Sequence, residues 1–105
     1  MKRVAIAAIS IAPLGEGASV SEYVAAALRV LKEDGRVEWE LGPMCTTVWG
    51  EPAHIFDVIL KMQEVMFEMG AVRVSTVIKM DERRDKPLDP RAKVRSVLDK
   101  LEDHP

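Results

Sequence analysis

Residues 4 to 31, VAIAAISIAPLGEGASVSEYVAAALRVL, decide the fold of this chain because they join an apolar strand to a helix through a short turn. Alternate side chains of a strand point to opposite faces. One face carries Ala5, Ala7, Ile9 and Ile11, and the other carries Val4, Ile6, Ala8, Ser10 and Ala12. Neither face is suited to water. Helices in so short a chain can cover only one face, so the second face should be buried by another subunit, lined by a ligand, or both.

The composition is typical of one soluble domain, which we expect to span residues 1–105. The chain is 48% hydrophobic and 30% charged, with a net charge of −2. Because the charge is near balance and no long basic run occurs, nucleic acid and anionic membrane surfaces are disfavoured as partners. No segment approaches the roughly 20 apolar residues of a membrane span. Cys45 is the single cysteine, which excludes an intrachain disulfide and fits a cytoplasmic protein.

The first helix and the two strands after it have clear boundary signals. Ser19 and Glu22 match a capping box at the helix start, and Gly35 suits the left-handed position that ends a helix. Period-two patterns then predict strands at residues 37–41 and 44–49, separated by a Gly-Pro turn.

The second half of the chain repeats the alternation of helix and strand. A long helix is predicted from Pro52 to Gly70, a fourth strand over 72–80, and a short final helix from Asp89-Pro90. The order β-α-β-β-α-β, with right-handed crossovers, predicts an α+β protein with a ferredoxin-like fold. In this fold a four-stranded antiparallel sheet carries both helices on one face, and the C-terminal helix is an addition.

The residues that could support catalysis are few. His54 is expected in the first turn of the second long helix, where a solvated side chain is the ordinary interpretation. Cys45 has no histidine near it in sequence, and free cysteine is commonly a small buried hydrophobe. We therefore expect a binding protein with no catalytic residues, no metal and no cofactor. The enzymatic alternative is a small isomerase or monooxygenase with Cys45 or His54 in its pocket.

One short strand combines side chains suited to a flat heteroaromatic ligand. These are Met44, Thr46, Thr47 and Trp49. The indole of Trp49 could stack on such a ring, and threonine hydroxyls could bind ring nitrogens or an amino group. The same residue types are also good strand formers at a subunit interface, so both interpretations stay open.

Several motifs resemble those of the YkoF-like thiamine-binding proteins. They are APLGEGASVSEYVAAALRVL, ELGPMCTTVWGE, RVSTVIKMDERRDK and KVRSVLDKL, which together cover most of the chain. The resemblance implies a ferredoxin-like subunit that pairs sheet to sheet, often as a tetramer. It also implies that thiamine or its hydroxymethylpyrimidine part is bound and not converted.

The resemblance carries over to particular positions. The stretch Pro13-Leu14-Gly15 matches the first loop of the family, Thr46 matches the threonine of the hairpin, and Gly50 matches a glycine after the third strand. Two positions depart from the family: Cys45 replaces a glycine, and Trp49 replaces a glutamate. Loss of that carboxylate removes a possible partner for the thiazolium charge or the aminopyrimidine, and Trp49 could replace it by stacking or could fill the pocket.

These considerations define a candidate ligand-binding set and a function. The set is Ser10, Pro13, Gly15, Met44, Thr46, Thr47 and Trp49. The predicted function is non-enzymatic binding of thiamine or hydroxymethylpyrimidine near a subunit interface of a homo-oligomer, either a dimer or a tetramer. The alternative is a regulatory or interaction module that binds another small effector, such as an amino acid.

Overall fold

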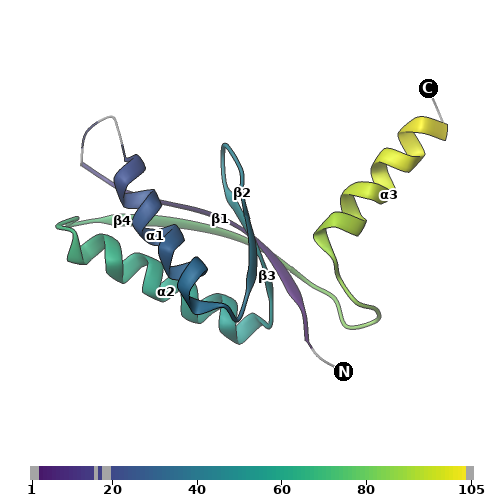
Figure 1. Ribbon diagram of the computed structural model, residues 1–105, viewed down its shortest axis with the longest axis horizontal. Coiled ribbons are helices and arrows are strands. Elements are labelled where there is room, and N and C mark those ends of the chain that lie inside the picture. The colour runs from purple at the N-terminus through teal and green to yellow at the C-terminus, as the bar shows by residue number, and fades with distance from the viewer. Residues whose placement is uncertain (1–2, 16, 18–19, 104–105) are drawn as a thin grey trace.

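The computed structural model describes residues 3–15, 17 and 20–103. The elements in chain order are β1 (Ala5–Pro13), α1 (Ser21–Asp34), β2 (Glu38–Leu41), β3 (Thr46–Gly50), α2 (Pro52–Glu68), β4 (Val74–Glu82) and α3 (Pro90–Asp103). The strands form one antiparallel sheet in the order β2-β3-β1-β4, and α1 and α2 lie together on one face of it (Figure 1). The predicted ferredoxin-like fold is confirmed.

The central strand β1 supplies the middle of the hydrophobic core. Its residues Ala5, Ala7 and Ile9 are buried beneath α1 and α2, as their alternation predicts. They pack in one cluster with apolar side chains of β3 and both helices, among them Val48, Leu31, Ile55, Met62 and Met66. Both methionines of this cluster are fully buried. Met69, at the C-cap of α2, is exposed.

The strand boundaries that differ most from the predicted ones are in β3 and β4. β3 begins at Thr46 and not at residue 44, because the two residues before it belong to the hairpin turn, in which the Gly42 N–H donates to the Cys45 carbonyl at 2.9 Å. β4 begins at Val74 and extends to Glu82, which pairs with the first residue of β1. The charged residues Asp81 and Glu82, beyond the predicted end of the strand, are therefore part of the sheet.

The ends of α1 agree with the sequence in part. Gly35 adopts φ of 76°, the left-handed conformation expected after the helix. The helix begins at Ser21, with Val20 at the N-cap and no side-chain capping bond. Ser19, the predicted capping residue, lies outside the described residues.

A network of charged side chains ties the end of α1 to α2. The Arg36 guanidinium donates to Asp34 at 2.8 Å and also to Asp57 on α2. Lys61 Nζ lies 3.2 Å from Asp57 Oδ2 and 3.8 Å from Asp34 Oδ2. The Asp34 side chain is only 8% exposed. Hydrogen bonds from Arg36 lower the pKa of Asp34 to about 2, against an opposing contribution from burial.

Because of this lowered pKa, the free energy of unfolding depends on pH in the acidic range. Because the folded-state pKa of Asp34 lies below the unfolded value of about 3.9, its contribution is complete above pH 5 and is lost as pH falls from about 4 towards 2. We expect Asp34→Asn to be less stable than the wild type in urea unfolding at pH 7, and most of the difference to be lost at pH 2, near the folded-state pKa of Asp34. Glu64→Gln, on the exposed side of α2, is the control. A difference as large at pH 2 as at pH 7 would contradict this assignment.

Candidate functional site

The face of the sheet opposite α1 and α2, here called the open face, is crossed by rows of side chains from all four strands. The register places Glu38, Trp49, Ile6 and Asp81 in the first row and Glu40, Thr47, Ala8 and Lys79 in the second. Farther along β1, Ser10 lies opposite Val77, whose side chain is 64% exposed. The second face of β1 is therefore not buried by α1 or α2.

The N-terminal part of α3 contacts the first row of the open face. The Arg91 guanidinium carbon lies 5.5 Å from the centroid of the Trp49 ring. Lys93 Nζ lies 2.7 Å from Asp81 Oδ2. The two contacts lie on opposite sides of β1. The Asp89 carboxylate accepts the Arg91 backbone N–H at 2.9 Å and so caps the start of this helix.

The rest of α3 extends away from the sheet (Figure 1). Its apolar side chains are between 45 and 61% exposed, namely Val94, Val97, Leu98 and Leu101. This apolar stripe does not pack against the core of its own subunit.

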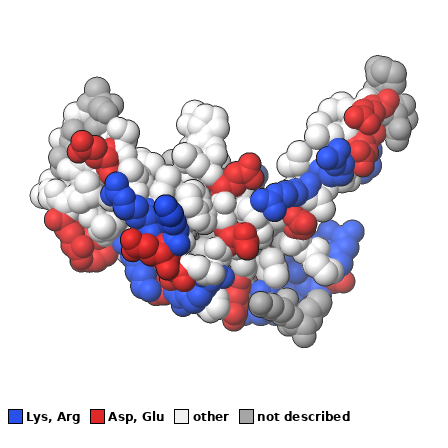
Figure 2. Space-filling model, viewed as in Figure 1, with Lys and Arg blue, Asp and Glu red and all other residues white. Residues whose placement is uncertain are grey.

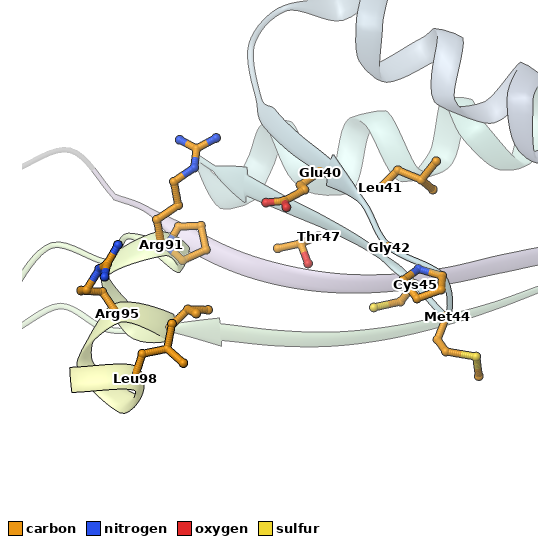
Figure 3. A pocket seen from close by; sticks show the side chains of 12 residues that line it. Glu40, Leu41, Gly42, Met44, Cys45, Thr47, Arg91, Arg95 and Leu98 are labelled. Atoms are coloured by element: carbon orange, nitrogen blue, oxygen red, sulfur yellow. The ribbon is translucent and has the colours of Figure 1, made fainter. Parts of the chain in front are cut away.

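Two cavities flank the β2–β3 hairpin, one on each side. The helix-side cavity, of about 140 Å³, is lined by Ile9, Ser10, Ile11, Val24, Ala27, Leu28, hairpin residues 41–46 and Met62. The open-face cavity, of about 580 Å³, is lined by hairpin residues 40–45, Thr47, Pro90, Arg91, Val94, Arg95 and Leu98 (Figure 3). The hairpin separates the two cavities.

The structure brings some of the predicted ligand-binding residues together and separates others. Ser10, Met44 and Thr46 line the helix-side cavity, and Met44 also lines the open-face cavity with Thr47. The two threonines point to opposite faces because they are consecutive in β3. Pro13 and Gly15, at the end of β1 and in the following turn, line neither of these cavities.

Trp49 lines neither of the two hairpin cavities, so it lies apart from both Thr46 and Thr47. It borders a separate hollow with Glu51, His54 and Arg91, where β3 ends and α2 begins. The Arg91 guanidinium lies over its ring, where the sequence hypothesis places a ligand. The departure from the family at this position therefore does not fill the helix-side cavity.

The helix-side cavity combines apolar walls with hydrogen-bonding groups. The pairing of β1 with β3 ends at Ile9 and Thr46, whereas the pairing of β1 with β4 continues to Pro13. In an antiparallel strand, every second residue directs its N–H and C=O to the same side. Past Ile9, the backbone N–H and C=O groups on this side of β1 have no β3 residue opposite them and face the hairpin loop. The Thr46 hydroxyl, on a residue that is 7% exposed, can both donate and accept.

Sequence reasoning missed the contributions of α1 and α3 to these cavities. Arg91 and Arg95 reach the open-face cavity from α3, and Val24 and Leu28 reach the helix-side cavity from α1. The periodicity of each helix predicts which side is apolar. It does not say which part of the hairpin that side meets.

Cys45 and His54, the two candidates for catalysis, lie in different places. Cys45 is half-buried and lines both hairpin cavities, whereas His54 borders the Trp49 hollow and places Nε2 3.6 Å from Glu51 Oε2. Within residues 3–15, 17 and 20–103, no three His, Cys, Asp or Glu side chains gather as a metal site. In the same part of the chain, no helix has the length and apolar character needed to cross a bilayer.

Comparison with known proteins identifies the family. The model of the thiamine-binding protein family matches residues 7–98. The chain belongs to this family. A relative in the thiamine-binding protein family, the UPF0045 protein YqgV of Bacillus subtilis, is 40% identical over 97 residues, or 89% of this chain and 93% of YqgV. A UPF0045 protein of Staphylococcus xylosus is 37% identical over 103 residues, covering 94% of this chain and 96% of its own.

Solved structures agree with this assignment. A hypothetical protein from Methanocaldococcus jannaschii superposes with a TM-score of 0.83 at 33% identity, covering 92% of this chain and 97% of its own. A Thermotoga maritima protein, described as a proposed thiamine biosynthesis/salvage protein, has a TM-score of 0.75, with 90% of this chain and 98% of its own covered. At 21% identity it shows a common fold. The resemblance to thiamine-binding proteins inferred from the sequence motifs is confirmed.

The contact between Arg91 and Trp49 can be measured by fluorescence. In a Trp39→Phe background, Trp49 is the only indole in the chain. We expect Arg91→Ala to shift its emission to longer wavelength, because the ring loses its cover, and to lower stability by no more than about 1 kcal/mol. Arg95→Ala, one turn farther along α3, is the control. Unchanged emission in Arg91→Ala would show that α3 does not lie over Trp49 in solution.

Proposed function

We propose that this chain is a non-enzymatic binding protein for thiamine or its hydroxymethylpyrimidine moiety, with the pyrimidine ring in the helix-side cavity. The observation that supports this most is a cavity of about 140 Å³ in a member of the thiamine-binding protein family. An apolar cavity of about 150 Å³ accommodates a single benzene ring. The helix-side cavity therefore suits one small heteroaromatic ring better than a whole cofactor.

The lining of this cavity matches the chemistry of an aminopyrimidine. Val24, Leu28 and Met62 supply apolar surface for the faces of the ring. At the sheet side, the Thr46 hydroxyl and the β1 backbone past Ile9 offer donors and acceptors to ring nitrogens and the exocyclic amine. A thiazolium substituent on the bound pyrimidine would extend out of the cavity on the hairpin side, where Met44 is exposed.

Binding without conversion is supported by the positions of the reactive side chains. Cys45 lines the proposed pocket, but His54, in the first turn of α2, borders a different hollow. A cysteine nucleophile is normally activated by a base within hydrogen-bond reach. Cys45 does not have this partner in His54.

Ligand-induced stabilisation tests the proposal. Thiamine or hydroxymethylpyrimidine at about 100 times its dissociation constant should add roughly 2.7 kcal/mol and raise the unfolding midpoint by several degrees. Thr46→Val should weaken binding by about tenfold through loss of a buried hydrogen bond. Thr47→Val is the matched control, because its side chain points to the open face and should leave the affinity unchanged.

Two outcomes would contradict the proposal. If neither compound raises the unfolding midpoint, thiamine and its pyrimidine are excluded as ligands. Equal weakening by both threonine variants would move the ligand out of the helix-side cavity. Stabilisation by an anionic amino acid in place of thiamine would favour the regulatory module.

We also infer that the open face is buried between copies of this chain, as a dimer or tetramer. Val77 is exposed on this face beside the small residues of β1, and Val97 and Leu101 are exposed on α3. An isolated helix of 14 residues is only marginally stable in water, so α3 requires a further packing partner. Continuity of these apolar side chains favours a second copy that covers the face and the helix together.

Light scattering at micromolar concentration tests this assembly. We expect the mass of a dimer or tetramer for the wild type, and a shift towards the monomer for Val77→Glu or Val97→Glu, because each places a carboxylate in the proposed interface. Leu60→Glu, on the exposed side of α2, is the control and should keep the wild-type mass. A monomeric wild type would overturn the inference.

A further inference from the structure

The outer edge of β4 is a long row of backbone hydrogen-bonding groups. This strand lies at one end of the sheet and pairs only with β1. It has nine residues, whereas β2 at the opposite edge has four. Within the described residues, no backbone hydrogen bond joins 74–82 to a segment other than β1. The helix α3 does not run along this edge, because it projects from the body of the molecule (Figure 1, Figure 2).

One hydrogen bond fixes the direction of every backbone group in β4. The Leu14 N–H donates to the Arg73 carbonyl at 2.8 Å, so Arg73 faces β1. The register from there to Glu82 is unbroken. Every second residue of an antiparallel strand directs its N–H and C=O to the same side, so the odd-numbered residues face β1 and the even-numbered ones face outward. The outward residues pair with the buried face of β1 and therefore place their side chains on the helix side of the sheet; they are Val74, Thr76, Ile78, Met80 and Glu82.

This edge lacks the features that usually prevent a strand from pairing with another chain. Exposed edges are commonly protected by short strands, by proline or by β-bulges. Residues 74–82 contain no proline or glycine, and no bulge interrupts their register with β1. The edge of β4 is therefore suited to pairing with a further strand.

We propose that β4 pairs antiparallel with β4 of a second copy of this chain, about a two-fold axis at Val77. The two four-stranded sheets then become one continuous sheet. A two-fold axis makes the contact self-complementary, because each copy offers the same row of outward N–H and C=O groups. This contact is separate from the proposed burial of the open face, and the two contacts together give a tetramer.

Charge and apolar side chains support an axis at Val77. Outward residues must pair with outward residues, so the axis passes through a residue and not between two. At Val77, it places Asp81 opposite Arg73 of the partner subunit at both ends of the pairing. It also places Met80 opposite Val74 of the partner subunit on the helix side. Among the described residues, Arg73 forms no ion pair within its own subunit, so its guanidinium is available for this contact.

Neighbouring axes are disfavoured by like charges. An axis at Ile78 places Arg73 opposite Arg83 of the partner subunit. An axis at Thr76 places Arg73 opposite Lys79 of the partner subunit, and an axis at Lys79 places that side chain opposite its own copy. Like charges directly opposite each other destabilise strand pairing. Axes farther out leave less of the strand paired.

Disulfide formation tests the pairing and its register. With the axis at Val77, Thr76 lies opposite Ile78 of the partner subunit in a hydrogen-bonded pair, with Cα atoms about 5.5 Å apart, which suits a disulfide. In a Cys45→Ser background, we expect the Thr76→Cys/Ile78→Cys double variant to form a covalent dimer under mild oxidation, seen in a non-reducing gel. Ile78→Cys alone is the control and should not form one, because this axis does not place Ile78 opposite its own copy.

The assembly in solution tests the charge contact. We expect full-length Val97→Glu protein, in which the open-face contact is weakened, to be a dimer joined through β4. Adding Arg73→Asp should raise its dimer dissociation constant at least about fivefold, because two attractive pairs become repulsive. Arg29→Asp, the same charge change on the exposed side of α1, is the matched control and should leave the constant unchanged. Analytical ultracentrifugation measures both.

Several outcomes would overturn the proposal. Absence of a covalent dimer from the double variant would exclude pairing of β4 with a second copy, and a covalent dimer from Ile78→Cys alone would exclude the axis at Val77. Equal effects of Arg73→Asp and Arg29→Asp would exclude the charge contact. Because Thr76 and Ile78 lie on the helix side, an open-face contact does not bring them together. Cross-linking of the double variant with an unchanged mass of Val97→Glu would therefore remove the open-face contact and keep this one.

Discussion

The strand β1 pairs with β4 along its whole length but with β3 only from Ala5 to Ile9, and this unequal pairing shapes both sides of the molecule. Where β3 has ended, the hairpin loop departs from the sheet and leaves space beneath α1. That space becomes the helix-side cavity. If β3 continued to pair with β1, the backbone groups past Ile9 would be hydrogen-bonded within the sheet and would not face the cavity.

The hairpin then separates two environments with different chemistry. Thr46 and Thr47 are neighbours in sequence, yet one side chain faces an apolar cavity under the helices and the other faces a cavity bordered by arginines. The helix-side cavity suits an uncharged ring with hydrogen-bonding edges. Consecutive residues of one short strand therefore contribute to two separate cavities.

The contacts that hold α3 in place differ from those that hold α1 and α2. Those two helices are held by the buried core and, at the end of α1, by the network around Arg36. In contrast, α3 is attached to the open face through Arg91 and Lys93, both of which are charged and exposed. Exposed ion pairs and cation–π contacts each contribute little to stability. The position of this helix is therefore the part of the fold most open to influence by a ligand or a second copy.

The sequence by itself determined the order of helices and strands, the two faces of β1 and the family, because these depend on local periodicity, on turn residues and on motifs that are continuous in the chain. The same reasoning placed Ser10, Met44 and Thr46 in a candidate site, and the structure brings these three together. Tertiary structure alone decided that Trp49 lies under Arg91 and that Arg95 borders the open-face cavity. These contacts join residues more than 40 positions apart, and their geometry depends on strand register and on the approach of α3, which local patterns do not encode.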